Sequence, residues 1–233
     1  NLRKNAQSLH YENSGFLFFE NGDGFNFKSY EGLFCKKDGS PRPTKAHYSP
    51  KIKNIGEDPV YALQSVENFT ILKQFDTLNN TANGVYASRL ITHDLYNKTF
   101  SENDFDYNKE YSKQNHLEQD DNGDKRSDNG ILPFFNYDTG ETFGNKNEGV
   151  IYYQSTTSKV HDSYEQPEVT DILQKRVSQH IAANSLMIEI IAPGTTELRV
   201  GDIVNFTLPK YAPNSKNDTQ DNDKYLSGRY LIS

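Results

Sequence analysis

The C-terminal part of the chain is centred on the sequence Leu198-Arg199-Val200-Gly201-Asp202-Ile203-Val204-Asn205-Phe206-Thr207-Leu208-Pro209. A glycine between apolar strand residues, followed by an aspartate, suits a bend or bulge. We therefore expect a positive φ at Gly201 and a side chain of Asp202 that caps a nearby backbone N–H. We expect Gly228, in the last apolar run, to shape a corner in the same way.

Around this centre the residues Val169–Ser233 form one predicted unit. Ile172, Leu173, Val177 and Ile181 recur at helical spacing, which indicates one apolar helix face. We expect this unit to close a small β-barrel. In order, it is predicted to contain a helix (Val169–Ala183), a strand (Leu186–Ile191), a turn (Pro193–Thr196), a strand (Glu197–Leu208), a long polar loop and a last strand (Tyr225–Ser233).

Near the N-terminus, two aromatic runs predict a β-hairpin. Gly15–Glu20 is a short apolar run, and Phe25–Tyr30 alternates aromatic and polar residues. Asn-Gly and Asp-Gly between two such runs favour a tight turn. We expect Phe25 and Phe27 to face a core.

The turn of this hairpin contains Gly22 and Gly24 within the sequence Asn21-Gly22-Asp23-Gly24. Its Asp and Asn oxygens resemble part of a calcium loop, but the EF-hand spacing and the closing glutamate are absent. A turn is the better interpretation. We predict that five turn residues define the fold: Gly22, Gly24, Gly201, Asp202 and Gly228.

The middle of the chain predicts further β structure. Alternation indicates strands at Val66–Phe75 and Val85–Asp94, the second extended by Leu95–Phe100, with a turn at Asn79–Gly84 between them. We expect successive antiparallel strands, because no helical pattern separates these runs. Other expectations are the tail of a helix at Leu2–Leu9, a linker or long surface loop at Cys35–Pro50, a helix at Val60–Val66, and short strands at Phe105–Tyr107, Ile131–Phe135 and Gly149–Gln154.

The most polar region, Asn108–Gly130, is predicted to be a surface loop that interrupts the fold. A metal site there is a weaker alternative, because basic residues dilute the carboxylates and ligand spacing is absent. The sequence has no Gly-rich phosphate loop, GxSxG or HExxH motif. We therefore predict no catalytic, cofactor-binding or metal-binding residue, and we interpret His180 as a capping or solvent contact at the end of its helix.

Composition narrows the class of protein. The 233 residues include 15 Tyr, 14 Phe and no Trp, which leans towards β structure. The formal charge of −7 argues against non-specific nucleic-acid binding. Cys35 is the only cysteine, so no internal disulfide can form, and we expect a buried thiol in a reduced compartment. No apolar run reaches the roughly 18–20 residues that cross a bilayer, so we predict no membrane span.

The order of several motifs resembles the baseplate hub (tail hub) proteins of contractile-tailed bacteriophages. The hairpin at Gly15–Leu33 and the strand pair at Gly84–Phe105 are similar to two earlier stretches of that family. The C-terminal similarity lies in Leu173-x-x-Arg176-x-x-Gln179, a strand ending in Pro193-Gly194, Leu198-Arg199-Val200-Gly201-Asp202-Ile203-Val204, a polar insertion, and Leu226-Ser227-Gly228-Arg229-Tyr230-Leu231-Ile232.

The resemblance implies a structural virion protein in the tail baseplate, assembled in the host cytoplasm. Its subunits would form a homotrimeric ring with two β-barrel tube domains each, related to the spike proteins of type VI secretion systems. The implied partners are the tail-tube protein, the spike protein and the baseplate wedge proteins, with no direct nucleic-acid binding.

Within that family this sequence would supply the part after the first tube domain. Because it begins with Asn1 and ends at Ser233 inside an expected strand, we interpret it as a piece of a longer chain. Residues 1–45 would be a remnant of the middle region with the hairpin, and residues 46–233 a tube-like barrel with the insertion around 108–130. The expected fold class is thus mainly β (α+β), an antiparallel β-barrel with one packed amphipathic helix and a small hairpin and helical region at the N-terminus.

Two other functions compete with this one. Aromatic residues and 32 carboxylates would suit a carbohydrate-binding β module or a glycoside hydrolase, although the absence of Trp weakens that hypothesis. A secreted adhesin rests only on composition and on five Asn-x-Ser/Thr sites, which so Asn-rich a chain produces by chance.

Overall fold

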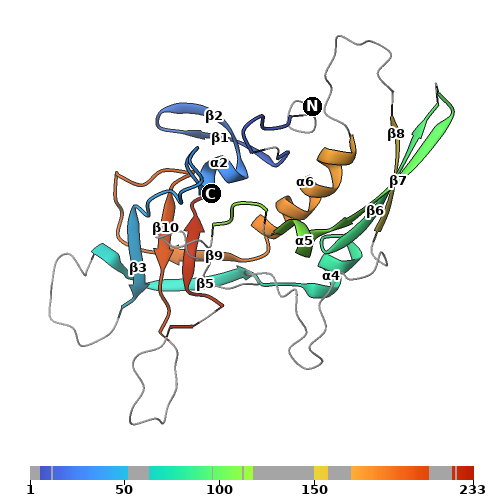
Figure 1. The fold of residues 1–233 in the computed structure, drawn as a ribbon. Helices are drawn as coiled ribbons and strands as arrows, with labels where there is room; N and C mark the ends of the chain where they lie inside the picture. The colour runs from blue at the N-terminus through green and yellow to red at the C-terminus, as the bar shows by residue number, and fades with distance from the viewer. Residues whose placement is uncertain are drawn as a thin grey trace.

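The protein has a mixed α+β fold made mostly of strands, seen in the computed structural model (Figure 1). The structure describes residues 6–11, 13–51, 63–95, 97–111, 113–117, 150–156, 169–209, 222–223 and 225–233. The elements in chain order are β1 (Phe16–Asn21), β2 (Gly24–Ser29), α2 (Tyr30–Phe34), β3 (Ala46–Pro50), β4 (Ser65–Val66), β5 (Asn68–Lys73), α4 (Thr77–Ala82), β6 (Ala87–Asp94), β7 (Thr99–Asp106), α5 (Tyr107–Tyr111), β8 (Val150–Thr156), α6 (Val169–Ala183), β9 (Met187–Ile191), β10 (Ile203–Phe206) and β11 (Gly228–Leu231).

The strands form four sheets, with the orders β1-β2, β11-β10-β3-β4, β5-β9 and β7-β6-β8. Within the described residues none of these sheets closes into a barrel. The β11-β10-β3-β4 and β5-β9 sheets share one hydrophobic core, in which Tyr48, Val66, Val204 and Phe206 are buried against Phe69 and Ile188. A second core forms around Val85, Tyr86, Phe105, Tyr107 and Tyr111.

The N-terminal hairpin is confirmed: β1 and β2 pair antiparallel, with Phe18 opposite Phe27. The expectation that Phe25 and Phe27 face a core is wrong, because these side chains are 75% and 37% exposed. The rings of Phe16 and Phe27, and of Phe18 and Phe25, stack instead on the outer face. The opposite face of the hairpin, with Leu17 and Phe19, turns towards the rest of the molecule.

The predicted all-antiparallel order is wrong for three strand pairs. β3 runs parallel to both β10 and β4, and β6 runs parallel to β8. Parallel neighbours need a long crossover connection, and their pairing is set by contacts far apart in sequence. Antiparallel pairing holds for β6 with β7, β5 with β9 and β10 with β11.

The helix α6 is confirmed with the predicted bounds, Val169–Ala183. Its most buried positions include polar side chains, whose groups bind to neighbouring backbone. The Gln174 amide donates to the carbonyl and hydroxyl oxygens of Ser88 in β6, and the Ser178 hydroxyl donates to the Val85 carbonyl at 2.8 Å. Figure 1 shows α6 lying beside the sheet of β6, β7 and β8. These bonds fix the helix to that sheet.

Several predicted boundaries change. The strand predicted at Glu197–Leu208 is limited to β10, because Gly201 lies in a turn that the Asp202 N–H closes onto the Arg199 carbonyl. The last strand is limited to β11, because Tyr225 and Leu226 form a turn before it. The turn predicted at Asn79–Gly84 is largely the helix α4, which Asp76 caps by accepting the Asn79 N–H. Leu95–Phe100 does not extend β6, since the chain turns there and returns as β7.

Three further expectations concern loops. Cys35–Pro50 is not only a linker, because it contains β3. Ala6–Leu9 is not helical. Most of the polar insertion, the strand expected at Ile131–Phe135 and residues 60–62 lie outside the described residues.

Candidate functional site

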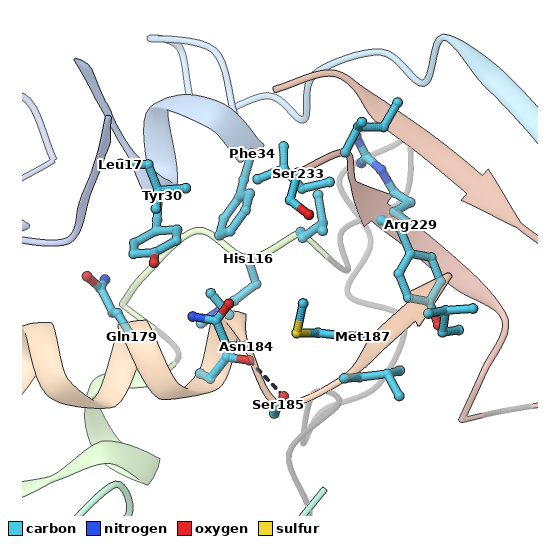
Figure 2. Close-up of a pocket in the computed structure, with 18 of the residues that line it drawn as sticks. Leu17, Tyr30, Phe34, His116, Gln179, Asn184, Ser185, Met187, Arg229 and Ser233 are labelled. Atoms are coloured by element: carbon cyan, nitrogen blue, oxygen red, sulfur yellow. Dashed lines mark hydrogen bonds between the residues drawn. The ribbon is translucent and has the colours of Figure 1, made fainter. Parts of the chain in front are cut away.

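A cavity of about 580 Å³ lies where the N-terminal hairpin, α6 and the C-terminal strands meet. Leu17 of β1 and Tyr30, Glu31 and Phe34 of α2 form one wall. The end of α6 and β9 form the floor, and β11 lies on the far side (Figure 2). Pockets that bind small molecules have volumes of roughly 300–1,000 Å³. This cavity therefore has the size of a ligand site.

One wall of the cavity is polar and connected. The Gln179 amide of α6 donates to Gln114 Oε1 at 3.2 Å. The neighbouring Asn115 donates its side-chain amide to Glu31 Oε2 at 3.1 Å, and the Asn13 amide donates to the other carboxylate oxygen, Glu31 Oε1. Three separate segments thus place acceptor oxygens side by side on this wall.

Glu31 is the only buried carboxylate among the described residues. Burial raises the pKa of Glu31 above its ordinary value, against the hydrogen bonds from Asn13 and Asn115, which lower it. In the described part of the chain no lysine, arginine or histidine forms an ion pair with this carboxylate. A perturbed carboxyl group in a cavity marks a candidate functional site.

Gln179 is 8% exposed, and its Oε1 has no hydrogen-bond partner among the described residues. In Figure 2 its side chain points up from α6 towards the ring of Tyr30. A buried acceptor without a donor costs roughly 1–3 kcal/mol. A Cβ placed on Gly15 would lie 2.7 Å from this oxygen, so the acceptor is covered by the chain rather than open to the cavity.

The remaining surface of the cavity is mostly apolar. Phe34, Met187 and Phe206 contribute to it, and the His116 ring stacks on Tyr111 with ring centroids 3.6 Å apart. His116 Nε2 lies 2.7 Å from the Tyr111 carbonyl oxygen. This stacking holds the segment after α5 over the cavity.

The interpretation of His180 as a cap or solvent contact needs correction. His180 is exposed near the end of α6, but its Nδ1 lies 2.7 Å from the Tyr30 hydroxyl oxygen, at hydrogen-bond distance. Its side chain therefore connects α6 to α2 beside the cavity.

The five predicted turn residues lie outside the cavity. Gly22 and Gly24 form the hairpin tip, and Gly24 has a φ of +116°. Gly201 has a φ of +92°, and Asp202 Oδ2 accepts the Arg199 N–H and contacts Lys45 Nζ, both at 2.9 Å. Gly228 begins β11 opposite Phe206.

Sequence reasoning missed the cavity residues Glu31, Gln114, Asn115 and Gln179. They come from three segments without a shared spacing, so no motif could bring them together. The one available signal was Glu31 itself, a charged residue inside the apolar run Tyr30–Phe34.

No protein-family model matches the chain, and no curated protein is significantly similar to it. Among the described residues, no group of three or more His, Cys, Asp or Glu side chains could hold a metal ion. The helices of that same part are too short or too polar to cross a bilayer.

Proposed function

We propose that the protein is a structural assembly subunit, a baseplate hub protein whose homotrimeric ring joins a phage tail tube to its central spike. The order of motifs described above supports this proposal. The observation that carries it is the outer face of the β1–β2 hairpin. Phe18 and Phe25 stack there while 64% and 75% exposed.

Exposed apolar patches of this kind mark surfaces that meet another macromolecule. A hairpin also presents its aromatic rings at low conformational cost, because Phe18 stacks on Phe25 and Phe16 stacks on Phe27 across the two strands. The hairpin is itself anchored, since the Arg199 guanidinium forms an ion pair with Asp23 at its tip. A rigid aromatic face suits permanent assembly into a ring.

The proposal extends to the barrel. We assign β3, β4, β5, β9, β10 and β11 to a tube-like barrel within residues 46–233. The shared core of the two sheets, centred on Val204 and Phe206, supports this assignment. We also propose that strands from the rest of the assembly complete the barrel. In the same proposal, the protein is located in the virion and has no catalytic role.

The alternative is a carbohydrate-binding module or a glycoside hydrolase. Glycoside hydrolysis usually needs two carboxyl groups about 5–10 Å apart. Glu31 is the one buried carboxylate in the described part of the chain, so we rank assembly first.

The test uses the full chain co-expressed with the tail-tube and spike proteins of the same genome. Multi-angle light scattering and cryo-electron microscopy should find a trimeric ring containing the partners. Phe18→Ser with Phe25→Ser should abolish the ring, whereas Leu78→Ser, which changes an exposed leucine of α4, should leave it intact. Monomers alone, together with saturable binding of a polysaccharide, would favour the alternative.

A further inference from the structure

We infer that the cavity described above binds a small organic amine, with its ammonium group against Glu31 and its apolar body against the aromatic and aliphatic lining. This inference goes beyond the proposed assembly role and does not depend on it.

The first step is the imbalance of donors and acceptors on the polar wall. Glu31 offers about four acceptor sites, of which the side-chain amides of Asn13 and Asn115 and the backbone N–H of Asn115 fill three. Gln114 Oε1, which accepts from the Gln179 amide, adds a further acceptor to the same wall. The side-chain amides of Gln179 and Asn115 already donate within the wall. Such a wall is complementary to a group that only donates, and an ammonium carries three donors.

The second step is charge. The carboxylate of Glu31 is buried without an ion-pair partner in the described part of the chain, and a buried charge is stable when it is paired. Glu189, which is exposed, adds a second acidic residue to the lining. The positively charged guanidinium of Arg229 donates to the Arg42 carbonyl and lies on the side of the cavity away from Gln179, so it is separated from the polar wall (Figure 2).

The third step is the rest of the lining. Tyr30, Phe34, Tyr107 and Tyr111 place aromatic rings around the polar wall, and aromatic faces attract cations. Met187, Ile188 and Phe206 offer apolar surface further in. An amine with an aryl or alkyl body satisfies both parts at once, whereas a carboxylic acid would meet Glu31 with like charge.

The experiment uses the one methionine of the chain, Met187, as a reporter. Its side chain lies on the cavity floor (Figure 2). The full chain is labelled at the methionine methyl group, and the Met187 resonance is assigned by its loss in Met187→Leu. Phenethylamine is then titrated and followed by NMR, and its affinity is measured by calorimetry.

We expect phenethylamine to shift the Met187 resonance with saturation. The neutral phenethyl alcohol and the anionic hydrocinnamate should bind at least about tenfold more weakly, because they lack the charged donor. Glu31→Gln should weaken amine binding by about tenfold or more. Glu67→Gln, an exposed change outside the cavity, should not alter it.

Equal binding of the amine and the alcohol would overturn the inference, as would no saturable shift at Met187. The ligand series needs no variant, so it remains decisive if Glu31→Gln fails to fold. Wild-type affinity in a folded Glu31→Gln protein would also overturn it.

Discussion

Gly201 lies directly against the ring of Phe19. A Cβ placed on Gly201 would lie 2.8 Å from Phe19 Cζ and 2.9 Å from Phe19 Cε2. Gly201 also has a φ of +92°, which L side chains rarely adopt. Two separate constraints therefore require glycine where the N-terminal hairpin meets the C-terminal strands.

Gly201→Ala should lower the free energy of unfolding by about 2–5 kcal/mol, because backbone strain and overpacking add. Chemical denaturation measures this change. Gly24→Ala serves as the control for φ alone, since Gly24 has a positive φ and nothing within 4 Å, and it should cost roughly 1–3 kcal/mol.

Gly194→Ala is a second control, because neither constraint acts at Gly194, which has open space around it and no positive φ. This substitution should change the free energy of unfolding by less than about 0.5 kcal/mol. If Gly201→Ala and Gly24→Ala cost the same, the contact with Phe19 contributes nothing. Replacement of Phe19 by Leu in the Gly201→Ala background should recover part of the loss, as a double-mutant cycle would show.

The buried Glu31 should make stability depend on pH. Burial raises the pKa of Glu31 in the folded protein above its ordinary value of 4.5. At a pH between 4.5 and this raised pKa, Glu31 is protonated in the folded state and deprotonated in the unfolded state. The free energy of unfolding should therefore fall as pH rises through this window. Denaturation of the wild type and of Glu31→Gln at several pH values measures the effect.

Comparison with Glu31→Gln is necessary, because Asp23, Asp38 and Asp76 have lowered pKa values and act in the opposite direction. Only the difference between the two proteins isolates Glu31. A difference that stays constant with pH would contradict the prediction. If an amine binds as inferred, its presence should reduce the slope.

Ser178 should contribute to the attachment of α6. Its hydroxyl is fully buried and donates to the Val85 carbonyl at 2.8 Å. Ser178→Ala removes that donor and should cost about 1 kcal/mol, equivalent to roughly 2–4 °C in Tm. Differential scanning calorimetry measures the shift. Ser155→Ala, at an exposed position of β8, is the matched control and should leave Tm unchanged.

Cys35 should be inert in the folded protein. Its thiol forms no disulfide and is fully buried, and burial raises its pKa to about 11. At pH 8 its thiolate fraction should be on the order of a hundredfold smaller than that of an ordinary cysteine, with access restricted further. Reaction with Ellman's reagent should be slow in buffer and fast in denaturant. Fast reaction in buffer would show that the thiol is accessible.

The elements that the sequence predicted well are those governed by local patterns. Helical spacing gave the bounds of α6, and alternation around Asn21–Gly24 gave the β1–β2 hairpin. α4 was missed because Asn and Thr have low helix propensity, although Asp76 supplied an N-cap signal. The outward orientation of Phe25 was missed because the alternation of a hairpin identifies two faces without saying which one is covered.

Non-local features were out of reach. The parallel pairing of β6 with β8 joins residues that no short-range rule relates. The burial of polar residues on α6 could not be predicted either, since Gln174 and Ser178 are buried only because Ser88 and Val85 supply acceptors. The cavity needs all of these placements at once, which is why no spacing pointed to Glu31 and Gln179.

The pairing of β3 with β10 has a consequence for synthesis. His47 lies opposite Asn205, 158 residues later in the chain. A ribosome therefore releases β3 long before its partner exists, while the β1–β2 hairpin can form at once. Until β10 emerges, Tyr48 and Val66 lack the buried neighbours Val204 and Phe206. Nascent chains of this protein should thus be clients of ribosome-associated chaperones over most of their elongation.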